Sequence, residues 1–359
     1  MDLNKKIRVF VVDDSMVFRN FLIKSIGQSP RFEVIGHAIN AFDAERQIPQ
    51  LKPDVVTLDI EMPGMTGPDF LRKFLPKYPV PVILVSSLNL RVFDALEVGA
   101  VDFVRKPDVK DEITSKQFVS TLLPKLLIAS NSRVRMPRGT VSSAPATTME
   151  ARQLQTPTPR TMEHFAGENK IVAIGASTGG TEAILDVVRN FPANMPGVVI
   201  TQHMPAGFTA MYAERLNKIL KMEVREAKNG DKVRQGLMLI APGGYQMRLV
   251  KRGTEYFVSC TIEEKVNGHA PSVDVLFNSV AQNARDQAIG VILTGMGSDG
   301  AAGLLRMRKN GAFTIGQDKE TCVVYGMPME AYKIGAVCQQ APLLTIPSII
   351  YRQLGLLTK

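Results

Sequence analysis

The chain has 359 residues, of which 45% are hydrophobic and 21% are charged. This length is large for one domain and sufficient for two, each able to bury its own core, and the composition excludes an extensively disordered protein. The formal net charge of +9 is uneven: residues 1–125 carry 17 Lys and Arg against 16 Asp and Glu, whereas residues 170–359 carry 21 against 15.

The sequence lacks the features of secreted or membrane proteins and those of nucleic-acid-binding proteins. The N-terminal sequence MDLNKKIRVFVVDDS has neither the apolar core nor the cleavage site of a signal peptide, and no apolar run approaches the length of a membrane span. We therefore predict a cytoplasmic protein with no membrane insertion. Nucleic-acid binding would need clustered basic residues or a recognisable reading module, and the sequence contains neither. The three cysteines match no metal-ligand or disulfide pattern.

The first part of the chain alternates short β-branched runs with amphipathic segments. The runs RVFVVDD, FEVIGHA, DVVTLD, VPVILVSS and VDFVRKP have the pattern of five buried strands, and residues 16–26 and 41–51 have the period of helices. This alternation predicts an α/β fold, with a flavodoxin-like, doubly wound parallel sheet covered by helices on both faces.

A change of composition separates this part from the rest. Residues 131–168 are rich in Ser, Thr, Pro, Gln and Arg and poor in aliphatic residues. Such a segment cannot bury enough apolar surface to offset the entropy lost on ordering. We therefore predict a first domain over residues 1–130, a flexible linker over 131–168 and a second domain over 169–359.

The second domain is also predicted to be a doubly wound parallel sheet, Rossmann-like, with a β-hairpin insertion. Strands are expected at IVAIG, GVVIT, AIGVILTG, FTIGQ and CVVYG, and helices over residues 181–189, 208–220, 272–285 and 301–310. Residues 222–261 predict hairpins instead: MLIAPGG, then QMRLVKRGTEYFVSCT with a turn near Arg252 and Gly253.

Polar residues end the strands of the first predicted sheet. Asp13 and Asp14 end the first strand, Asp59 the third, Ser86 the fourth and Lys106 the fifth. The carboxyl ends of strands in such a sheet open onto one crevice, where three carboxylates would repel unless a hard cation such as Mg²⁺ lay between them. A carboxylate beside a metal ion and a lysine can attack a phosphoryl group, and Asp59 is the candidate acceptor.

The motifs VVDDS, LDIEMPGMTG, VSS and RKP resemble the receiver domain of two-component response regulators over residues 6–125. A single strand-end carboxylate is usually only solvated, but four motifs in order argue against that reading. The resemblance implies phosphorylation by a histidine kinase. It implies these roles: Asp13, Asp14, Asp59 and the backbone carbonyl of Glu61 as Mg²⁺ ligands, Asp59 as phosphoacceptor, Ser86 as the hydroxyl that moves to the phosphate, Lys106 as its ion-pair partner and Phe103 as the aromatic switch residue.

A possible nucleophile opens the second domain. Ser177 lies in GASTG, residues 175–179, between a predicted strand and a predicted helix, and the sequence matches the G-x-S-x-G nucleophile elbow. The motif alone fits equally well a glycine-rich turn that holds a phosphate at a helix N-terminus.

A serine hydroxyl needs a base to accept its proton, and the base needs a third group to orient it. His203 ends the next predicted strand and Asp299 follows another, so both are expected in the same crevice as Ser177. His269 is expected in a loop. The chain order Ser, His, Asp differs from that of α/β-hydrolases, so the elbow does not imply that fold.

Six segments closely resemble the catalytic domain of the chemotaxis protein-glutamate methylesterases across most of residues 170–355: IGASTGGTEAI, QHMPAGFT, APGG, PSVDVLF, LTGMGSDGA and VVYGMP. The resemblance implies that Ser177 is the nucleophile, His203 the base and Asp299 the orienting acid. Thr178 and Met296 would lie in the active-site turns, with the N–H of Met296 facing the oxyanion. The sequence departs from the family pattern at NGHA, where a basic residue is frequent, and at Gly244, where we expected an acidic one.

The resemblance implies a phosphorylation-activated esterase that demethylates glutamate methyl esters on methyl-accepting chemotaxis receptors, releases methanol, deamidates specific receptor glutamines and needs no cofactor for the esterase step. The basic surplus of residues 170–359 is compatible with an acidic receptor surface. The expected regulation is that the unphosphorylated receiver domain covers the esterase crevice.

The two alternative functions are those of a transcription factor and of a nucleotide-binding domain. A receiver-linked transcription factor would instead show a helix-turn-helix, and a nucleotide-binding domain would need a P-loop lysine; the sequence has neither.

Overall fold

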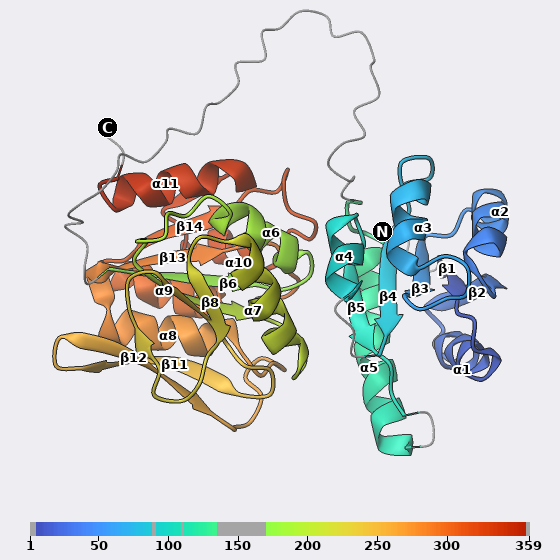
Figure 1. Cartoon of the computed structure of the whole chain (residues 1–359), viewed down its shortest axis with the longest axis horizontal. Coiled ribbons are helices and arrows are strands. Elements are labelled where there is room, and N and C mark those ends of the chain that lie inside the picture. Colours follow the sequence, from blue (N-terminus) through green and yellow to red (C-terminus); the bar gives the residue numbers. More distant parts are fainter. Residues whose placement is uncertain (1–4, 88–90, 109–110, 135–169, 357–359) are drawn as a thin grey trace, which may run out of the picture. The chain divides into compact units, whose positions relative to one another are not determined.

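The computed structural model describes residues 5–87, 91–108, 111–134 and 170–356 (Figure 1). The chain divides into two compact units, Met1–Ala144 and Pro145–Lys359, and each is considered by itself. Most of the predicted linker, residues 135–168, lies outside the described residues.

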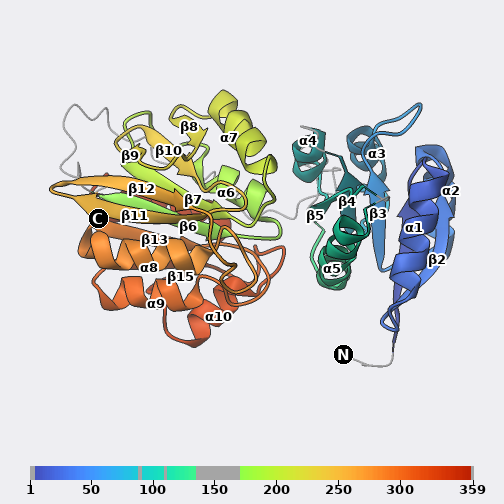
Figure 2. The ribbon, with the colours of Figure 1, turned by 90° about the horizontal axis from the view of Figure 1, so that it is seen from below.

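The first unit is the predicted flavodoxin-like sheet: five parallel strands in the order β2-β1-β3-β4-β5. Helix α1 packs against α5, and α3 packs against α2 and α4 (Figure 2). Strands β3 and β4 are buried along their whole length, and their sequences are apolar except for Thr57 and the polar residue that ends each strand. The bounds are β1 Ile7–Val12, α1 Met16–Gly27, β2 Phe32–Ala38, α2 Ala41–Leu51, β3 Val55–Asp59, α3 Gly67–Phe74, β4 Val82–Ser86, α4 Arg91–Glu97, β5 Asp102–Arg105 and α5 Glu112–Ala129.

The second unit contains a parallel sheet of seven strands in the order β15-β14-β13-β6-β7-β10-β8 and a separate antiparallel sheet, β11-β12-β9. The strands are β6 Ile171–Ala176, β7 Gly197–Gln202, β8 Glu223–Glu226, β9 Lys232–Val233, β10 Leu237–Ile240, β11 Gln246–Arg252, β12 Glu255–Thr261, β13 Ala288–Ile292, β14 Phe313–Gln317 and β15 Gln339–Ala341. The α-helices are α6 Gly180–Val188, α7 Phe208–Ile219, α8 Val273–Asn283, α9 Ala301–Lys309, α10 Met327–Lys333 and α11 Ile346–Gln353.

The structure confirms the predicted hairpin β11–β12, whose strands pair from Gln246 with Thr261 to Arg252 with Glu255. The other predicted hairpin is wrong. Strand β10 is hydrogen-bonded in parallel to β7 and β8, so it belongs to the main sheet. Its sequence LMLI is buried at every position, which is the pattern of a parallel strand covered on both faces.

The predicted strand CVVYG is also absent from the sheet. Tyr325 makes only an isolated bridge to Gly295, and the carbonyl of Val324 accepts hydrogen bonds from Gly295 and from Thr294 Oγ1. The backbone of this segment therefore braces the loop after β13 instead of extending the sheet.

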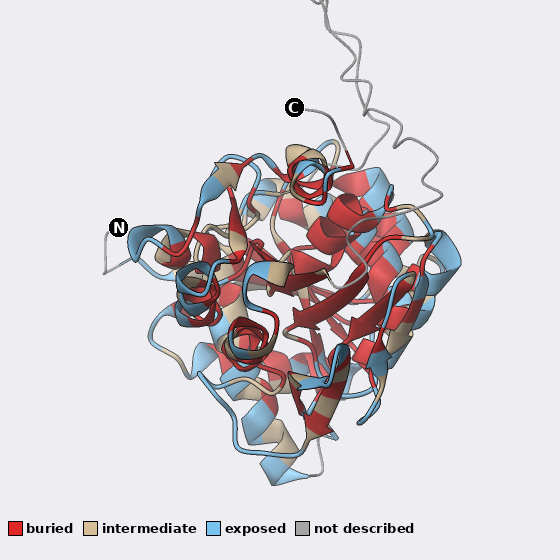
Figure 3. Cartoon of the chain, turned by 90° about the vertical axis from the view of Figure 1, so that its left-hand side faces the viewer, coloured by how far each residue is buried: buried red, intermediate tan, exposed pale blue. Residues whose placement is uncertain are grey.

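The central strand β6 lies between β7 and β13, and buried residues fill both faces of this part of the sheet (Figure 3). Helix α8 packs against α9 and β11, and its first residue approaches β6 closely. A Cβ atom at Gly175 would lie only 2.2 Å from Cγ1 of Val273, so glycine is required there. Within the described residues, no helix is both long enough and apolar enough to cross a membrane.

Candidate active site

The strand ends of the first unit bring an acidic cluster and a lysine together. Oxygen atoms of Asp13, Asp14 and Asp59 lie within 4.8 Å of one another. Nζ of Lys106 lies 2.9 Å from Oδ2 of Asp13 and 2.6 Å from Oδ2 of Asp59. These groups are the hard oxygen ligands and the neutralising cation that a phosphoryl-transfer site requires.

Burial dominates the electrostatics of this cluster. It raises the pKa of Asp13 and of Asp59, although Lys106 acts in the opposite direction on both. Burial also disfavours the charge of Lys106, but the two carboxylates outweigh it and raise the pKa of Lys106. One lysine therefore does not fully compensate the carboxylates, and a divalent cation beside them would supply the missing positive charge.

The three remaining residues predicted for this site lie nearby in the fold. Ser86 ends β4 and is 1% exposed, and its Oγ has no hydrogen-bond partner among the described residues. Phe103 is buried on β5, where Nζ of Lys125 lies 5.5 Å from the ring centroid. Glu61 is exposed, and its backbone N–H points at Oδ1 of Asp59 from 3.4 Å.

In the second unit, Ser177 follows β6 directly and lies on a turn that is held from both neighbouring strands. Its N–H donates to the carbonyl of Thr294, after β13, at 3.0 Å. Its carbonyl accepts from Nε2 of Gln202, the last residue of β7, at 2.8 Å. Gly179 has φ +75°, which favours glycine, and α6 begins at the next residue. Ser177 therefore lies on a sharp, hydrogen-bonded turn between β6 and α6.

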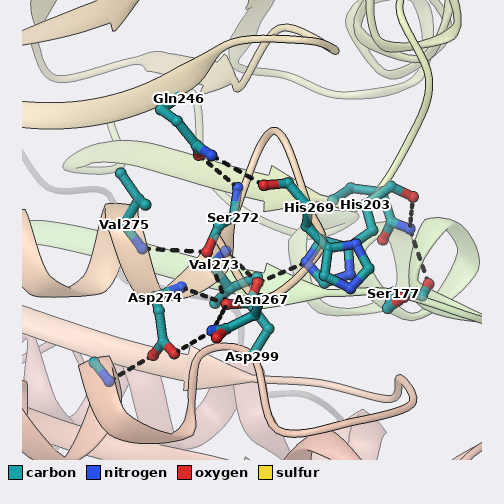
Figure 4. Close-up of polar contacts among 12 residues, drawn as sticks. Ser177, His203, Gln246, Asn267, His269, Ser272, Val273, Asp274, Val275 and Asp299 are labelled. Atoms are coloured by element: carbon teal, nitrogen blue, oxygen red, sulfur yellow. Dashed lines mark hydrogen bonds and ion pairs between the residues drawn. The ribbon is translucent and has the colours of Figure 1, made fainter. Parts of the chain in front are cut away.

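His203 follows β7, and its backbone N–H donates to the carbonyl of Ala176 at 3.1 Å. Its Nε2 lies 2.7 Å from Oδ2 of Asp299. In Figure 4 the imidazole lies between Asp299 and Ser177. No hydrogen bond joins Ser177 to His203 among these described side chains, and Nδ1 of His203 is buried without a partner. Because Nε2 is engaged by the carboxylate, Nδ1 is the nitrogen that can accept a proton.

Asp299 is 2% exposed, and both oxygen atoms of its carboxylate accept hydrogen bonds. The carboxylate lies beside the N-terminus of α8, whose first N–H groups point at it, and this position favours negative charge. Burial by itself would raise the pKa of Asp299, but His203 and the other donors outweigh it and hold the pKa well below its ordinary value. Besides His203, the donors are Val273 N at 2.7 Å on Oδ2, and Asn267 Nδ2 at 2.8 Å, Ser272 Oγ at 2.7 Å and Asp274 N at 3.2 Å on Oδ1.

The other two predicted residues flank the serine. Thr178 is buried, and its carbonyl accepts from Oγ1 of Thr294 at 3.0 Å. Met296 is 44% exposed in the loop after β13. Gly295, directly before it, approaches so closely that a Cβ atom there would lie 2.7 Å from Cβ of Ser177.

Two family models match the chain. The model described as CheB methylesterase matches residues 172–350, and the response regulator receiver domain matches residues 9–117. A Syntrophomonas wolfei protein named protein-glutamate methylesterase/protein-glutamine glutaminase 2 is 51% identical over 97% of this chain and 98% of its own. A Bordetella bronchiseptica protein named protein-glutamate methylesterase/protein-glutamine glutaminase is 45% identical over 98% of both chains. The chain belongs to the CheB-type protein-glutamate methylesterase family.

A solved member of this methylesterase family has a similar catalytic fold. The crystal structure of the Thermotoga maritima CheB methylesterase catalytic domain is 37% identical, has a TM-score of 0.50, and covers 52% of this chain and 98% of its own. The family assignment and the two matched regions confirm the sequence-based recognition of a receiver and a methylesterase in one chain.

Sequence reasoning missed the residues that surround the Asp299 carboxylate in this methylesterase: Asn267, Ser272 and the first N–H groups of α8. The sequence did carry a signal for part of this set. Ser272 precedes an apolar helical run and caps α8, as its Oγ accepts from the N–H of Val275 at 3.5 Å. A helix N-terminus recognised in this way is a candidate site for an anionic side chain.

Proposed function

We propose that Ser177, His203 and Asp299 hydrolyse γ-glutamyl methyl esters on methyl-accepting chemotaxis receptors, releasing methanol, and deamidate specific receptor glutamines. The observation that carries this assignment is the 2.7 Å pair of His203 and Asp299 beside the Ser177 turn. The relatives' names give the two activities, and the basic surplus of residues 170–359 suits an acidic receptor helix.

The geometry supports the following reaction. Oγ of Ser177 attacks the γ-carbonyl carbon while Nδ1 of His203 takes the hydroxyl proton. The tetrahedral intermediate breaks its bond to the methoxy oxygen, His203 returns the proton, and methanol leaves an acyl-serine. Water then attacks the acyl carbon while Nδ1 of His203 takes its proton, the bond to Oγ of Ser177 breaks, and His203 returns the proton to Oγ as glutamate is released. A glutamine side chain follows the same course with ammonia as the leaving group.

We assign the stabilisation of the oxyanion to backbone N–H groups of Thr178 and Met296. Both residues lie in turns that meet at Ser177, and the 2.7 Å approach of a Cβ atom at Gly295 to Cβ of Ser177 indicates how tightly the two turns are packed. Loss of one such donor costs about 3 kcal/mol of transition-state stabilisation. The esterase reaction as written uses no cofactor.

We propose that the receiver is phosphorylated on Asp59 by a histidine kinase. Asp13, Asp14, Asp59 and the carbonyl of Glu61 would hold Mg²⁺, which would neutralise the transferring phosphoryl group. Ser86 and Phe103 would move towards the phosphate, and Lys106 would pair with it. The orphan Oγ of Ser86 supports this, because a phosphate oxygen would give it a partner.

The domain assignment remains as predicted: receiver 1–130, linker 131–168 and methylesterase 169–359. The end of α5 at Ala129 and the start of β6 at Ile171 support it. We place the protein in the cytoplasm, because its three cysteines are all free and reduced thiols are typical of that compartment.

The decisive experiment measures methanol release from methylated receptor membranes. We expect Ser177→Ala to abolish turnover, whereas Ser348→Ala, a matched removal of a hydroxyl on α11, should leave it unchanged. If the second domain instead used the residue 175–180 turn to bind a nucleotide, Ser177→Ala would keep the ligand. Substantial methanol release by Ser177→Ala would contradict the proposed nucleophile.

Regulation is tested by comparing the intact chain, with and without acetyl phosphate, against residues 169–359. If the receiver is inhibitory, the isolated catalytic domain should be faster than the unphosphorylated chain, and acetyl phosphate should close the difference. An isolated domain that is no faster than the unphosphorylated chain would rule out autoinhibition.

A further inference from the structure

A second imidazole lies directly on that of His203. The ring centroids of His203 and His269 are 3.6 Å apart, and the ring planes differ by 10° (Figure 4). This is nearly the contact distance of two flat rings, so their faces overlap with little offset. The side chain of His203 is 7% exposed, and the ring of His269 covers one of its faces.

Ring–ring attraction does not explain this arrangement. Aromatic pairs prefer offset or edge-to-face contacts with centroids about 4.5–7 Å apart. A full face-to-face overlap is therefore imposed by the backbone that carries His269, and the anchoring of that backbone can be followed in the structure.

His269 ends a tight turn over residues 266–269. Val266 and His269 exchange two backbone hydrogen bonds, of 3.0 and 2.9 Å, and Asn267 and Gly268 have positive φ angles. The carbonyl of His269 also accepts from Nε2 of Gln246, which starts β11. The turn is thus closed on itself and tied to the hairpin sheet.

The same turn reaches the acid of the site. Nδ2 of Asn267 donates to Oδ1 of Asp299 and to Oδ2 of Asp274, both at 2.8 Å. One short turn therefore contacts the base through the ring of His269 and the acid through the amide of Asn267. The two contacts together fix the plane of the His203 ring relative to the Asp299 carboxylate.

We propose that His269 is a positioning residue for the catalytic base: its ring holds the imidazole of His203 in the plane that directs Nδ1 at the hydroxyl of Ser177. This inference rests on the proposed roles of Ser177, His203 and Asp299. Without the overlying ring, His203 keeps its bond to Asp299 but can rotate about the axis of that bond. The base nitrogen then spends less time in line with the serine, and small errors of alignment reduce rates strongly.

The test replaces His269 by a ring of similar shape and by a side chain that is not planar. We expect His269→Leu to lower kcat for methanol release by at least about tenfold, with KM within about twofold, because docking is retained and alignment is lost. His269→Phe keeps a flat ring and should retain kcat within about threefold. His269→Ala is a second truncation in case leucine does not fit.

Two controls separate positioning from folding. Val266→Ala changes a side chain on the same turn without touching His203 and should match the unmodified chain. Thermal unfolding measures the stability of each variant, so a loss of kcat in a variant that unfolds at the same temperature as the unmodified chain reports lost alignment and not lost stability.

The remaining outcomes overturn the proposal. Full activity of both His269→Leu and His269→Ala would show that the ring is not needed, and equal loss in His269→Phe and His269→Leu would show that the imidazole matters for another reason. Ser177→Ala is assayed in parallel. If Ser177→Ala retains turnover, the proposed function is wrong. If Ser177→Ala is inactive while His269→Leu is fully active, only the proposed role of His269 is wrong.

Discussion

Asn267 donates one side-chain hydrogen bond to Asp299 at 2.8 Å and a second of the same length to Asp274. It is the group that separates two buried carboxylates, and the pKa of Asp274 is raised, chiefly by burial and also by Asp299. Asn267 thereby allows an ionised acid to lie beside another acid in the interior of the domain.

Replacing this amide by a carboxylate should be severe. We expect Asn267→Asp to lower kcat at pH 7 by at least about a hundredfold, because a third carboxylate would repel Asp299 and displace it from His203. Asn267→Ala should cost less, since it removes a donor without adding charge. Asn310→Ala is the control: it removes an amide that follows α9 and donates to the carbonyl of Arg306 on that helix. Equal activity of Asn267→Asp and Asn267→Ala would refute the electrostatic reason.

The charge of Asp299 should persist through the acid limb of the activity profile. A carboxyl whose folded pKa is lowered is ionised above its ordinary pKa of about 4 and loses its charge only well below that value. Asp299 should therefore stay ionised between pH 7 and about pH 5, and its protonation should not contribute to the fall of kcat/KM over this range.

Asp299→Asn tests both parts of this argument. We expect its kcat to fall by about 10³- to 10⁴-fold, because a neutral amide does not stabilise the imidazolium of His203. The steepness of the acid limb should be the same in the variant and in the unmodified chain. An acid limb that is steeper by one proton in the unmodified chain would contradict a lowered pKa for Asp299.

Glycine at position 295 should be essential for steric reasons. An added Cβ would lie 2.4 Å from Sδ of Met327 and 2.7 Å from Cβ of Ser177. Gly295→Ala must therefore displace the serine turn, and we expect kcat to fall by at least about a hundredfold. Gly335→Ala is a demanding control, because that residue has φ +73° but nothing within 4 Å of its would-be Cβ. A larger loss of kcat at 335 than at 295 would show that backbone strain dominates.

Lys106 should govern the chemistry of Asp59. Its substitution by methionine removes the cation 2.6 Å from Oδ2 of Asp59 and leaves the pKa of this buried carboxyl raised further. We expect phosphorylation of Lys106→Met by acetyl phosphate to slow by at least about tenfold, and Asp59→Asn to take up no phosphate. Lys116→Met, on the exposed face of α5, should behave like the unmodified chain. Normal phosphate uptake by Asp59→Asn would exclude Asp59 as the acceptor.

The sequence predicts those features that follow from local pattern and parallel topology. Strand β13 is a continuous apolar run, and the residues that follow parallel strands collect at one edge of the sheet, which is why His203 could be expected near Ser177. Strand β10 was misread because a four-residue apolar run fits a hairpin arm as well as a buried parallel strand. The polar edge strand β15 gives almost no periodic signal.

The contacts of the 266–269 turn could not be derived from the sequence. Asn267 and Asp299 are 32 residues apart, and His269 and His203 are 66 residues apart. Neither pair is related by helical or strand period. Their meeting depends on how the hairpin sheet and α8 pack over the carboxyl end of the main sheet, and that packing is a property of the whole domain.

The donors that surround Asp299 determine how far a proton can travel. Both of its oxygens accept at least two hydrogen bonds, which stabilise the negative charge and make the carboxylate too weak a base to take the proton from the imidazole of His203. A proton taken from the serine accordingly goes no further than the imidazole and stays there until the departing methanol or ammonia takes it up.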